Sequence, residues 1–415
     1  MTPTPPAGRA ALGFILVTVV LDVLGIGIIV PVLPKLVESF VDGDTVRASE
    51  VFGVFGTAWA VMQFVCSPIL GALSDRFGRR PVLLLSMTGL GLDYVLMALA
   101  PSLGWLFVGR VLSGMTAASF STANAYLSDV TPPDRRGAAF GAVGAAFGLG
   151  FVLGPAIGGL LGQYDPRLPF WVAAAFSLAN AVYGLVVLPE SLPPERRTAF
   201  SWARANPVGS LVLLGSNRQL LGLSTAHFLA MVGQNIYPAI FVLYAGFRYG
   251  WDERAVGLTL AAVGVSNIVV QGGLVRPVLA RLGERGAVRL GLTFAGLGYL
   301  AYGLAPTGGW MLAAVPVAAL GGFYAPAVQG LMTRRVGPDQ QGRLQGALSS
   351  LMGVGALFSP GMYTQTFARS IDGSLGAILP GVPFFLAATL LLAAVVVAFS
   401  STRAAPGELS TRPGG

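Results

Sequence analysis

The chain has 415 residues, of which 54% are hydrophobic and only 11% charged, with a formal net charge of +8. A soluble domain carries about 25% charged residues, so this composition excludes an ordinary soluble protein. The cations fall in short loops between apolar runs and not on one soluble face, which argues against a nucleic-acid partner. Apolar runs of helical length, without the alternation of barrel strands, predict an all-α polytopic membrane protein.

The apolar runs predict twelve transmembrane helices, arranged as two bundles of six. We expect these helices near residues 10–33, 50–73, 81–100, 103–127, 138–162, 168–188, 219–245, 253–275, 287–305, 309–333, 343–368 and 379–400. The first run shows no small-residue cleavage pattern, so we interpret it as a helix and not as a signal peptide. The predicted organisation is an N-terminal bundle at 1–188, a polar cytoplasmic linker at 189–218, a C-terminal bundle at 219–400 and a disordered tail at 401–415.

A short motif between the second and third predicted helices recurs in the second half of the chain. The motif is Gly71-Ala-Leu-Ser-Asp75-Arg-Phe-Gly78-Arg-Arg80, and its weaker copy is Ala280-Arg-Leu-Gly283-Glu-Arg285. The glycines at 78 and 283 are 205 positions apart, and so are the prolines at 133 and 338 and those at 155 and 360. Three pairs at one offset predict two homologous halves with the same bundle of helices.

The cations also predict the orientation of the chain. Most of the 26 Lys and Arg residues fall in alternate connections, on the side that carries both termini and the repeated motif. Because cytoplasmic loops of membrane proteins are enriched in Lys and Arg, both termini are expected in the cytoplasm.

Three charged residues lie well inside predicted helices of the first half: Asp22, Asp93 and Arg110. A charge at mid-bilayer costs roughly 2.5–3.5 kcal/mol on insertion scales, so such groups are candidates for function. Asp22 and Arg110 could pair across the bundle interior, and a carboxylate that alternates between arginine and a proton could couple transport to protons. The alternative is a static buried ion pair that fixes helix packing.

The interior of the second half carries neutral polar side chains in place of such charges. The candidates for binding a polar ligand there are His227, Gln234, Asn235, Asn267, Gln271 and Gln329. His227 lies 205 positions after Asp22, so it could be a second titrating site, although a packing or hydrogen-bonding histidine is the commoner case. The amides could likewise serve only to hold helices together.

The fifth predicted helix contains glycines at a regular spacing. Gly150, Gly154 and Gly158 recur every four residues, followed by Gly159, and Pro155 removes one backbone hydrogen bond and bends the helix. Small residues at this spacing allow close helix approach. Packing alone explains the pattern, and the functional alternative is a face that slides against the other half during gating.

Motifs of soluble enzymes are absent from the sequence. It contains no Gly-rich phosphate loop followed by Lys and Ser or Thr, no Cys/His metal cluster and no Gly-x-Ser-x-Gly. One histidine and one cysteine leave little for hydrolase chemistry. We therefore expect a protein that is not an enzyme, holds no cofactor and is driven by an ion gradient.

Several of these stretches resemble one known family. The loop Gly71–Arg80 resembles the cytoplasmic loop signature of the major facilitator superfamily, and Gly150–Gly159 resembles the helix 5 signature of its drug/proton antiporters. Leu21–Pro34, Gly91–Tyr94 and Gly109–Gly114 are similar to bacterial tetracycline/proton antiporters. The resemblance spans nearly the whole chain, is strongest in the first half, and implies two pseudo-symmetric six-helix bundles.

The resemblance also implies roles for individual residues. Asp22, Asp93 and Arg110 match charged positions that matter for proton exchange. The gating loop is expected to comprise Asp75, Arg76, Gly78, Arg79 and Arg80, with Asp129 as a partner of its arginines. Polar positions near the cavity match Gln63, Gln234 and Gln271. The chain departs from the family at Asn267 and Gly296, where many tetracycline exporters carry a histidine and an aspartate.

The resulting hypothesis is proton-coupled efflux of an amphipathic drug, tetracycline-like or multidrug, by alternating access. The alternatives are export of an endogenous metabolite or sugar, and a membrane sensor or scaffold that transports nothing. The expected partners are the drug, protons and the lipid bilayer of a bacterial inner membrane, with no nucleic acid and a monomeric protein. A divalent metal is expected only as a companion of the drug, if the substrate is tetracycline.

Overall fold

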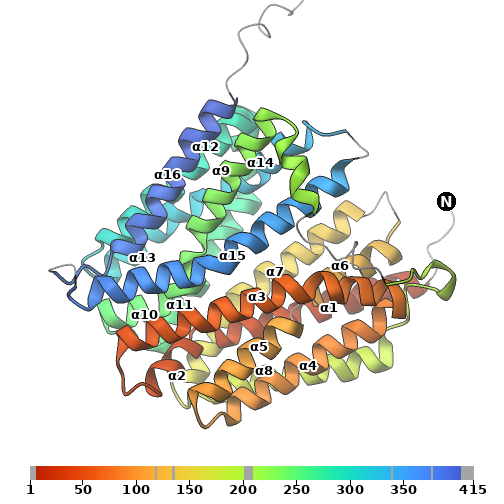
Figure 1. The fold of residues 1–415 in the computed structure, drawn as a ribbon, viewed down its shortest axis with the longest axis horizontal. Coiled ribbons are helices and arrows are strands. Elements are labelled where there is room, and N and C mark those ends of the chain that lie inside the picture. Colours follow the sequence, from red (N-terminus) through yellow and green to blue (C-terminus); the bar gives the residue numbers. More distant parts are fainter. Residues whose placement is uncertain are drawn as a thin grey trace, which may run out of the picture. The chain divides into compact units, whose positions relative to one another are not determined.

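The structure is a computed structural model, and it describes residues 6–116, 119–132, 136–200, 209–337, 340–374 and 377–402. Helices and their connections make up all of these ranges, with no β-strand among them (Figure 1). The all-α fold class predicted from the composition is therefore confirmed. The proposed tail at 401–415 lies almost wholly outside the described residues.

The first half contains eight helical segments, which correspond to six predicted helices. They are α1 (Pro6–Ile29), α2 (Leu33–Ser39), α3 (Thr45–Phe77), α4 (Arg79–Leu99), α5 (Leu103–Thr116), α6 (Ser119–Val130), α7 (Arg136–Gly162) and α8 (Leu168–Val187). The first predicted helix, 10–33, corresponds to α1, and the short α2 follows it after a turn at Pro31, with Pro34 in its first turn. Asp44 starts α3 as its N-cap, where its side chain accepts a hydrogen bond from the backbone N–H of Arg47 at 3.1 Å.

The second half repeats this pattern with more interruptions. Two short 3₁₀ turns, η2 (Pro194–Arg196) and η3 (Gly209–Gly215), lie in the predicted linker. The later elements are α9 (Arg218–Gln234), α10 (Ile236–Tyr249), α11 (Glu253–Val269), the π-helical η4 (Val270–Leu274), α12 (Val275–Leu304), α13 (Gly308–Ala319), η5 (Leu320–Phe323), α14 (Tyr324–Thr333), α15 (Gln341–Ile371) and α16 (Val382–Thr402). Nine helical stretches among the described residues are long and apolar enough to cross a membrane.

The repeated motif has the same backbone feature in both halves. Gly78, between α3 and α4, has a φ of 106°, and Gly283, within α12, has a φ of 64°. Both values lie in the region that favours glycine, and each breaks a helix at the repeated position. The 205-residue repeat predicted from the sequence thus has a structural counterpart, with α12 turning at Gly283.

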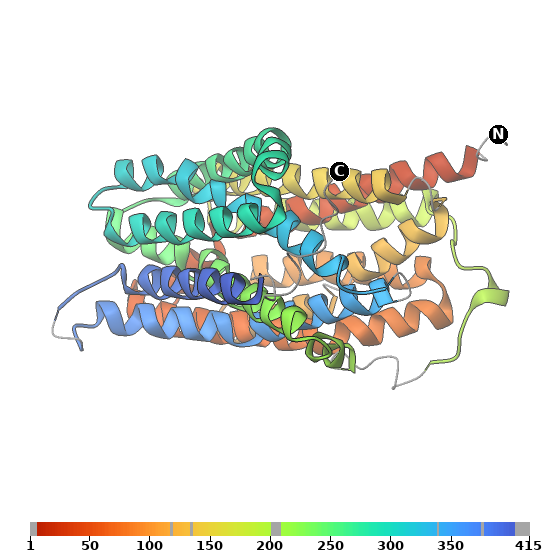
Figure 2. The same cartoon turned by 90° about the horizontal axis from the view of Figure 1, so that it is seen from above.

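The chain divides into two compact units by its internal contacts. The first unit comprises residues 1–207 with two later segments, Tyr237–Val265 and Ala356–Pro380, and the second comprises the remainder. In the first unit, α1 packs along α7 and α8, and both views show α1 and α7 side by side (Figure 2). In the second unit, α16 packs between α9 and α12.

Each unit has its own apolar core. In the first unit, Phe14, Val19, Leu83 and Tyr126 belong to one buried cluster that joins α1 to α4 and α6. In the second unit, a smaller cluster joins η4 and the start of α12 to η5. Asp22, Asp93 and Arg110 belong to the first of these units.

Candidate functional site

Two carboxylates and one guanidinium lie inside the first unit. Asp22 on α1 and Asp93 on α4 are 2% and 1% exposed, and the side chain of Arg110 on α5 is 14% exposed. Arg110 forms an ion pair with Asp93, with Nη2 3.9 Å from Oδ2. Its Nη2 also lies 3.2 Å from the sulfur of Met97, one turn after Asp93 on α4.

Tyr94 links these three groups. It is 1% exposed, and Asp22, Asp93 and Arg110 all lie close enough to interact electrostatically with its phenol. The residues predicted from the scarcity of charge are therefore gathered around one tyrosine, and we call the four residues the buried cluster. The structure shows an ion pair between Arg110 and Asp93 on the neighbouring helix. The pairing of Arg110 with Asp22 stays a prediction.

The charge balance of the buried cluster is uneven. With both carboxylates ionised, it carries one net negative charge, because a single arginine faces two acids. A charge is costly to bury in a membrane. Binding of one proton by either carboxylate makes the cluster neutral, so its composition suits the uptake and release of a proton.

Asp22 has a neutral neighbour that the sequence analysis did not single out. Asn180 on α8 donates from Nδ2 to Oδ1 of Asp22 at 3.3 Å, and it is completely buried. Asn180 could not be recognised from the sequence, because a single Asn in an apolar helix often serves only to hydrogen-bond neighbouring helices together.

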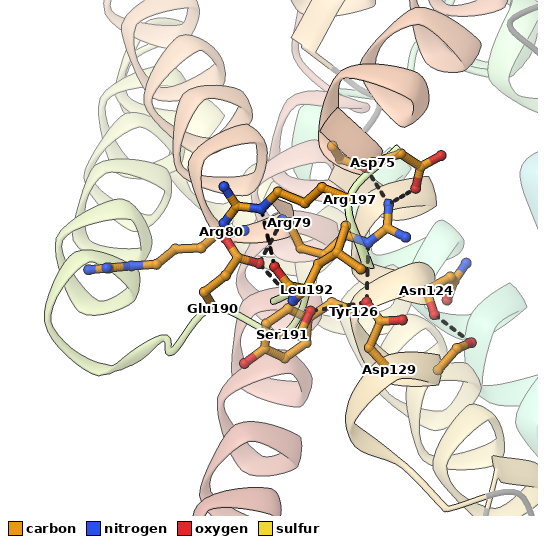
Figure 3. A network of polar contacts seen from close by, with 12 residues as sticks. Asp75, Arg79, Arg80, Asn124, Tyr126, Asp129, Glu190, Ser191, Leu192 and Arg197 are labelled. Carbon is orange, nitrogen blue, oxygen red and sulfur yellow. Dashed lines mark hydrogen bonds and ion pairs between the residues drawn. The ribbon is translucent and has the colours of Figure 1, made fainter. Parts of the chain in front are cut away.

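The Gly78 loop carries a second, ionic network (Figure 3). The guanidinium of Arg79 lies between two carboxylates, with Nη1 2.5 Å from Oδ1 of Asp75 and Nε 3.2 Å from Oδ2 of Asp129. Nη1 of Arg79 also donates to the hydroxyl of Ser74 at 2.6 Å. The loop and the end of α6 are thus joined by one arginine. Arg76 is exposed on the last turn of α3.

Glu190, at the start of the linker, completes this network and was missed by the sequence analysis. Its carboxylate accepts hydrogen bonds from the backbone N–H groups of Arg79 at 2.8 Å, Arg80 at 3.3 Å and Leu192 at 3.0 Å. It therefore caps the N-terminus of α4, where a negative charge is favourable. A Cβ at Gly78 would collide with the Glu190 side chain, so the close approach also requires glycine.

The second unit has an ion pair at the equivalent positions, with the signs exchanged. Glu284 Oε1 lies 3.0 Å from Arg334 Nη2. Residues 284 and 334 each follow residues 79 and 129 by 205 positions, the offset of the internal repeat. A basic loop residue paired with an acid in the first half thus corresponds to an acidic loop residue paired with a base in the second. Comparing the sequences of the two halves does not reveal this correspondence, because the residue types differ at both positions.

The predicted ligand-binding residues divide between the two units. Gln63 lies on α3 in the first unit and is half-buried, and the other six lie in the second. His227 on α9 is hydrogen-bonded through Nδ1 to the hydroxyl of Tyr324 at 2.7 Å. Exposed amides are contributed by Gln234, Gln271 and Gln329, and half-buried ones by Asn235 and Asn267. Gln271 belongs to the π-helical turn η4, a feature that often occurs at functional positions.

The glycines of α7 serve two different contacts. A Cβ at Gly154 would overlap the backbone of Gly27, and one at Gly158 would overlap that of Ile28, so this face lies directly on α1. Gly159 faces another direction, where a Cβ would overlap the backbone of α11 around Glu253. The regularly spaced glycines therefore pack within the first half, whereas Gly159 is among the residues of α7 that contact a helix of the second half.

The fold and the buried cluster together define a multi-pass helical membrane protein with ionisable groups enclosed in one helical unit. Residues 15–360 match the family model of the Major Facilitator Superfamily. The chain belongs to this superfamily, whose members are transporters of small molecules across lipid bilayers.

The comparisons with individual proteins agree with this assignment. The chain is 38% identical over 363 residues to the tetracycline resistance protein, class C, of Escherichia coli, a match that covers 87% of this chain and 90% of that protein. It is 35% identical over 387 residues to the class B protein of Escherichia coli, covering 91% and 93%. The crystal structure of the human organic anion transporter MFSD10 (TETRAN) matches with a TM-score of 0.70 and 22% identity, covering 95% of this chain and 100% of that one, which shows a shared fold.

Proposed function

We propose that this protein exports tetracycline-like drugs from the cytoplasm in exchange for protons by alternating access. The names of its relatives supply the drug class, since proteins of 35–38% identity over most of the chain are called tetracycline resistance proteins. The observation that supports proton coupling is the buried cluster, in which two buried carboxylates are accompanied by one arginine.

The proposed cycle follows from the charge of the cluster. When the cluster is open to the outside, one proton binds a carboxylate, and Asp22 is our candidate for the acceptor. The neutral cluster is cheaper to enclose than the charged one, so proton binding favours the change that closes the outer side. Release of the proton to the cytoplasm restores the negative charge, and drug binding there precedes the return. One proton per drug is the stoichiometry that one net charge supports.

The remaining features of the proposal follow the same reasoning. The protein would lie in the inner membrane of a bacterium with both termini in the cytoplasm, as the distribution of Lys and Arg indicates. It would act as a monomer and without catalysing a chemical reaction. No resident cofactor is needed, because the proton gradient supplies the energy, and a divalent metal would travel as part of a drug complex.

The test is drug transport by purified protein in liposomes with an imposed pH gradient. Labelled tetracycline is supplied with and without Mg²⁺, and a lipophilic cationic dye serves as the multidrug alternative. The wild type is expected to accumulate tetracycline only when the gradient is present. Asp22→Asn is expected to abolish gradient-driven accumulation, because the amide cannot take up a proton.

The matched control is Asp372→Asn, which removes a carboxylate of the same type from the loop after α15, where Asp372 is fully exposed. This variant is expected to transport like the wild type. If Asp22→Asn accumulates drug against the gradient as well as the wild type does, the assignment of Asp22 is wrong. If no gradient drives tetracycline transport by the wild type, the proposed function is wrong.

A further inference from the structure

A buried polar network joins α1 to α8 beside the buried cluster. Thr18 and Asn180 are 1% and 0% exposed. The hydroxyl of Thr18 donates to Oδ1 of Asn180 at 3.2 Å, and Nδ2 of Asn180 donates to the backbone carbonyl of Thr18 at 3.3 Å. The same Nδ2 donates to Oδ1 of Asp22 at 3.3 Å. Thr18 and Asp22 are four residues apart, so both lie on one face of α1.

The chemistry of these groups fixes the orientation of the amide. The backbone carbonyl of Thr18 can only accept a hydrogen bond, so the NH₂ group of Asn180 must face it. The amide oxygen then faces the Thr18 hydroxyl, which must donate. With that orientation set, the second N–H of Asn180 is directed to Asp22. Thr18 therefore determines that Asp22 meets a donor and not an acceptor.

A donor at this position favours one protonation state of Asp22. A hydrogen bond from a neutral amide stabilises the ionised carboxylate more than the protonated one. Asp93 from α4 and Arg110 from α5 lie, together with Asp22, around the phenol of Tyr94. Among the other helices that pack on α1, α8 contributes Tyr183 and no charged residue. Toward its end, α6 contributes Tyr126 and Asp129.

We propose that Asn180 is a positioning residue for proton coupling. Its amide N–H stabilises the ionised form of the Asp22 carboxylate, and Thr18 sets the orientation of the Asn180 amide. This inference rests on the proposed role of Asp22 in proton exchange. It assigns to α8 a part in coupling, although the helix carries no charged residue of its own. Loss of the donor should let Asp22 retain its proton at higher pH.

The test compares Asn180→Leu, which replaces the amide with an apolar group of similar size, with Thr18→Val, which removes the hydroxyl that orients it. The matched control is Ser177→Ala. Ser177 is one turn earlier on α8 and equally buried, and its hydroxyl has no hydrogen-bond partner among the described residues. Each protein is reconstituted in liposomes, and exchange is measured across a series of pH values.

Protonation of Asp22 is read separately, from the infrared carboxyl band that Asp22→Asn removes. This readout does not depend on transport. Asn180→Leu is expected to move the midpoint of this band about 1 pH unit upward, equivalent to a tenfold change in proton binding. Thr18→Val is expected to move it in the same direction by less, and Ser177→Ala to leave it in place. The midpoint of exchange should follow in each variant.

The possible failures are distinguishable. If the infrared midpoint of Asn180→Leu and Thr18→Val equals that of the wild type, the inference is overturned, whatever the transport result. If the midpoint moves as expected while no pH gradient drives drug transport in the wild type, Asn180 still sets the protonation of Asp22 and the proposed function is the part that fails.

Discussion

Removal of Arg110 should destabilise the first unit strongly. Its guanidinium lies 3.9 Å from the Asp93 carboxylate, whose side chain is completely buried. At an effective dielectric constant of about 20, two unit charges at this distance attract by roughly 4 kcal/mol. Removal of one partner from a buried pair costs about 3–5 kcal/mol, because the other charge is left without compensation. Arg110→Leu is therefore expected to lower stability by several kcal/mol.

The assay is thermal unfolding of the purified protein in detergent, followed by the loss of the monomer peak in size-exclusion chromatography. Arg110→Leu should lower Tm by several degrees, and the double variant Arg110→Leu/Asp93→Asn should recover most of the loss because neither charge is then buried. Arg76→Leu is the control, since this arginine is exposed on the last turn of α3. Equal Tm values for the single and double variants would refute the reasoning, as would a wild-type Tm for Arg110→Leu.

Three further changes test the glycine contact, the second ion pair and the cap of α4. Gly158→Val is expected to force α7 away from the backbone of Ile28 and to reduce the yield of folded protein, measured by size-exclusion chromatography of membrane extracts. Glu284→Arg should cost about 0.5 kcal/mol by placing two cations together, and adding Arg334→Asp should restore Tm. Glu190→Gln removes a charge worth about 0.3–1 kcal/mol at the N-terminus of α4 and should speed protease cleavage of the linker.

The fold could be predicted from the sequence because a chain that crosses a membrane can form few architectures. Apolar runs of about 20 residues and the need to satisfy every backbone group leave few architectures. The repeat at 205 positions correctly placed a break at Gly283, where the backbone of α12 is non-helical. The break beside Asn235 was not predicted as a helix end, because a single Asn inside an apolar run does not show whether the helix bends or stops.

The candidate site could be predicted from the sequence only in part. Asp22, Asp93 and Arg110 were identifiable because charges inside apolar runs are rare. Which carboxylate approaches the arginine depends on how the helices are rotated, and no periodicity in the sequence determines that. Asn180 and Glu190 were missed for a related reason, since each acquires its role from a partner more than 100 residues away in the chain.

The two halves share a backbone plan but differ in how they hold charge. An ion pair is present near each repeated loop, with its signs reversed between the halves, so the cation comes from the loop in one half and from its partner segment in the other. The interior has diverged further. Asp22 corresponds to His227, which is joined to the hydroxyl of Tyr324 in a hydrogen bond that needs no charge. A neutral pair is cheaper to bury than an ion. Among the described residues, the second unit thus has a neutral hydrogen bond at the position where the first unit buries the carboxylate of Asp22.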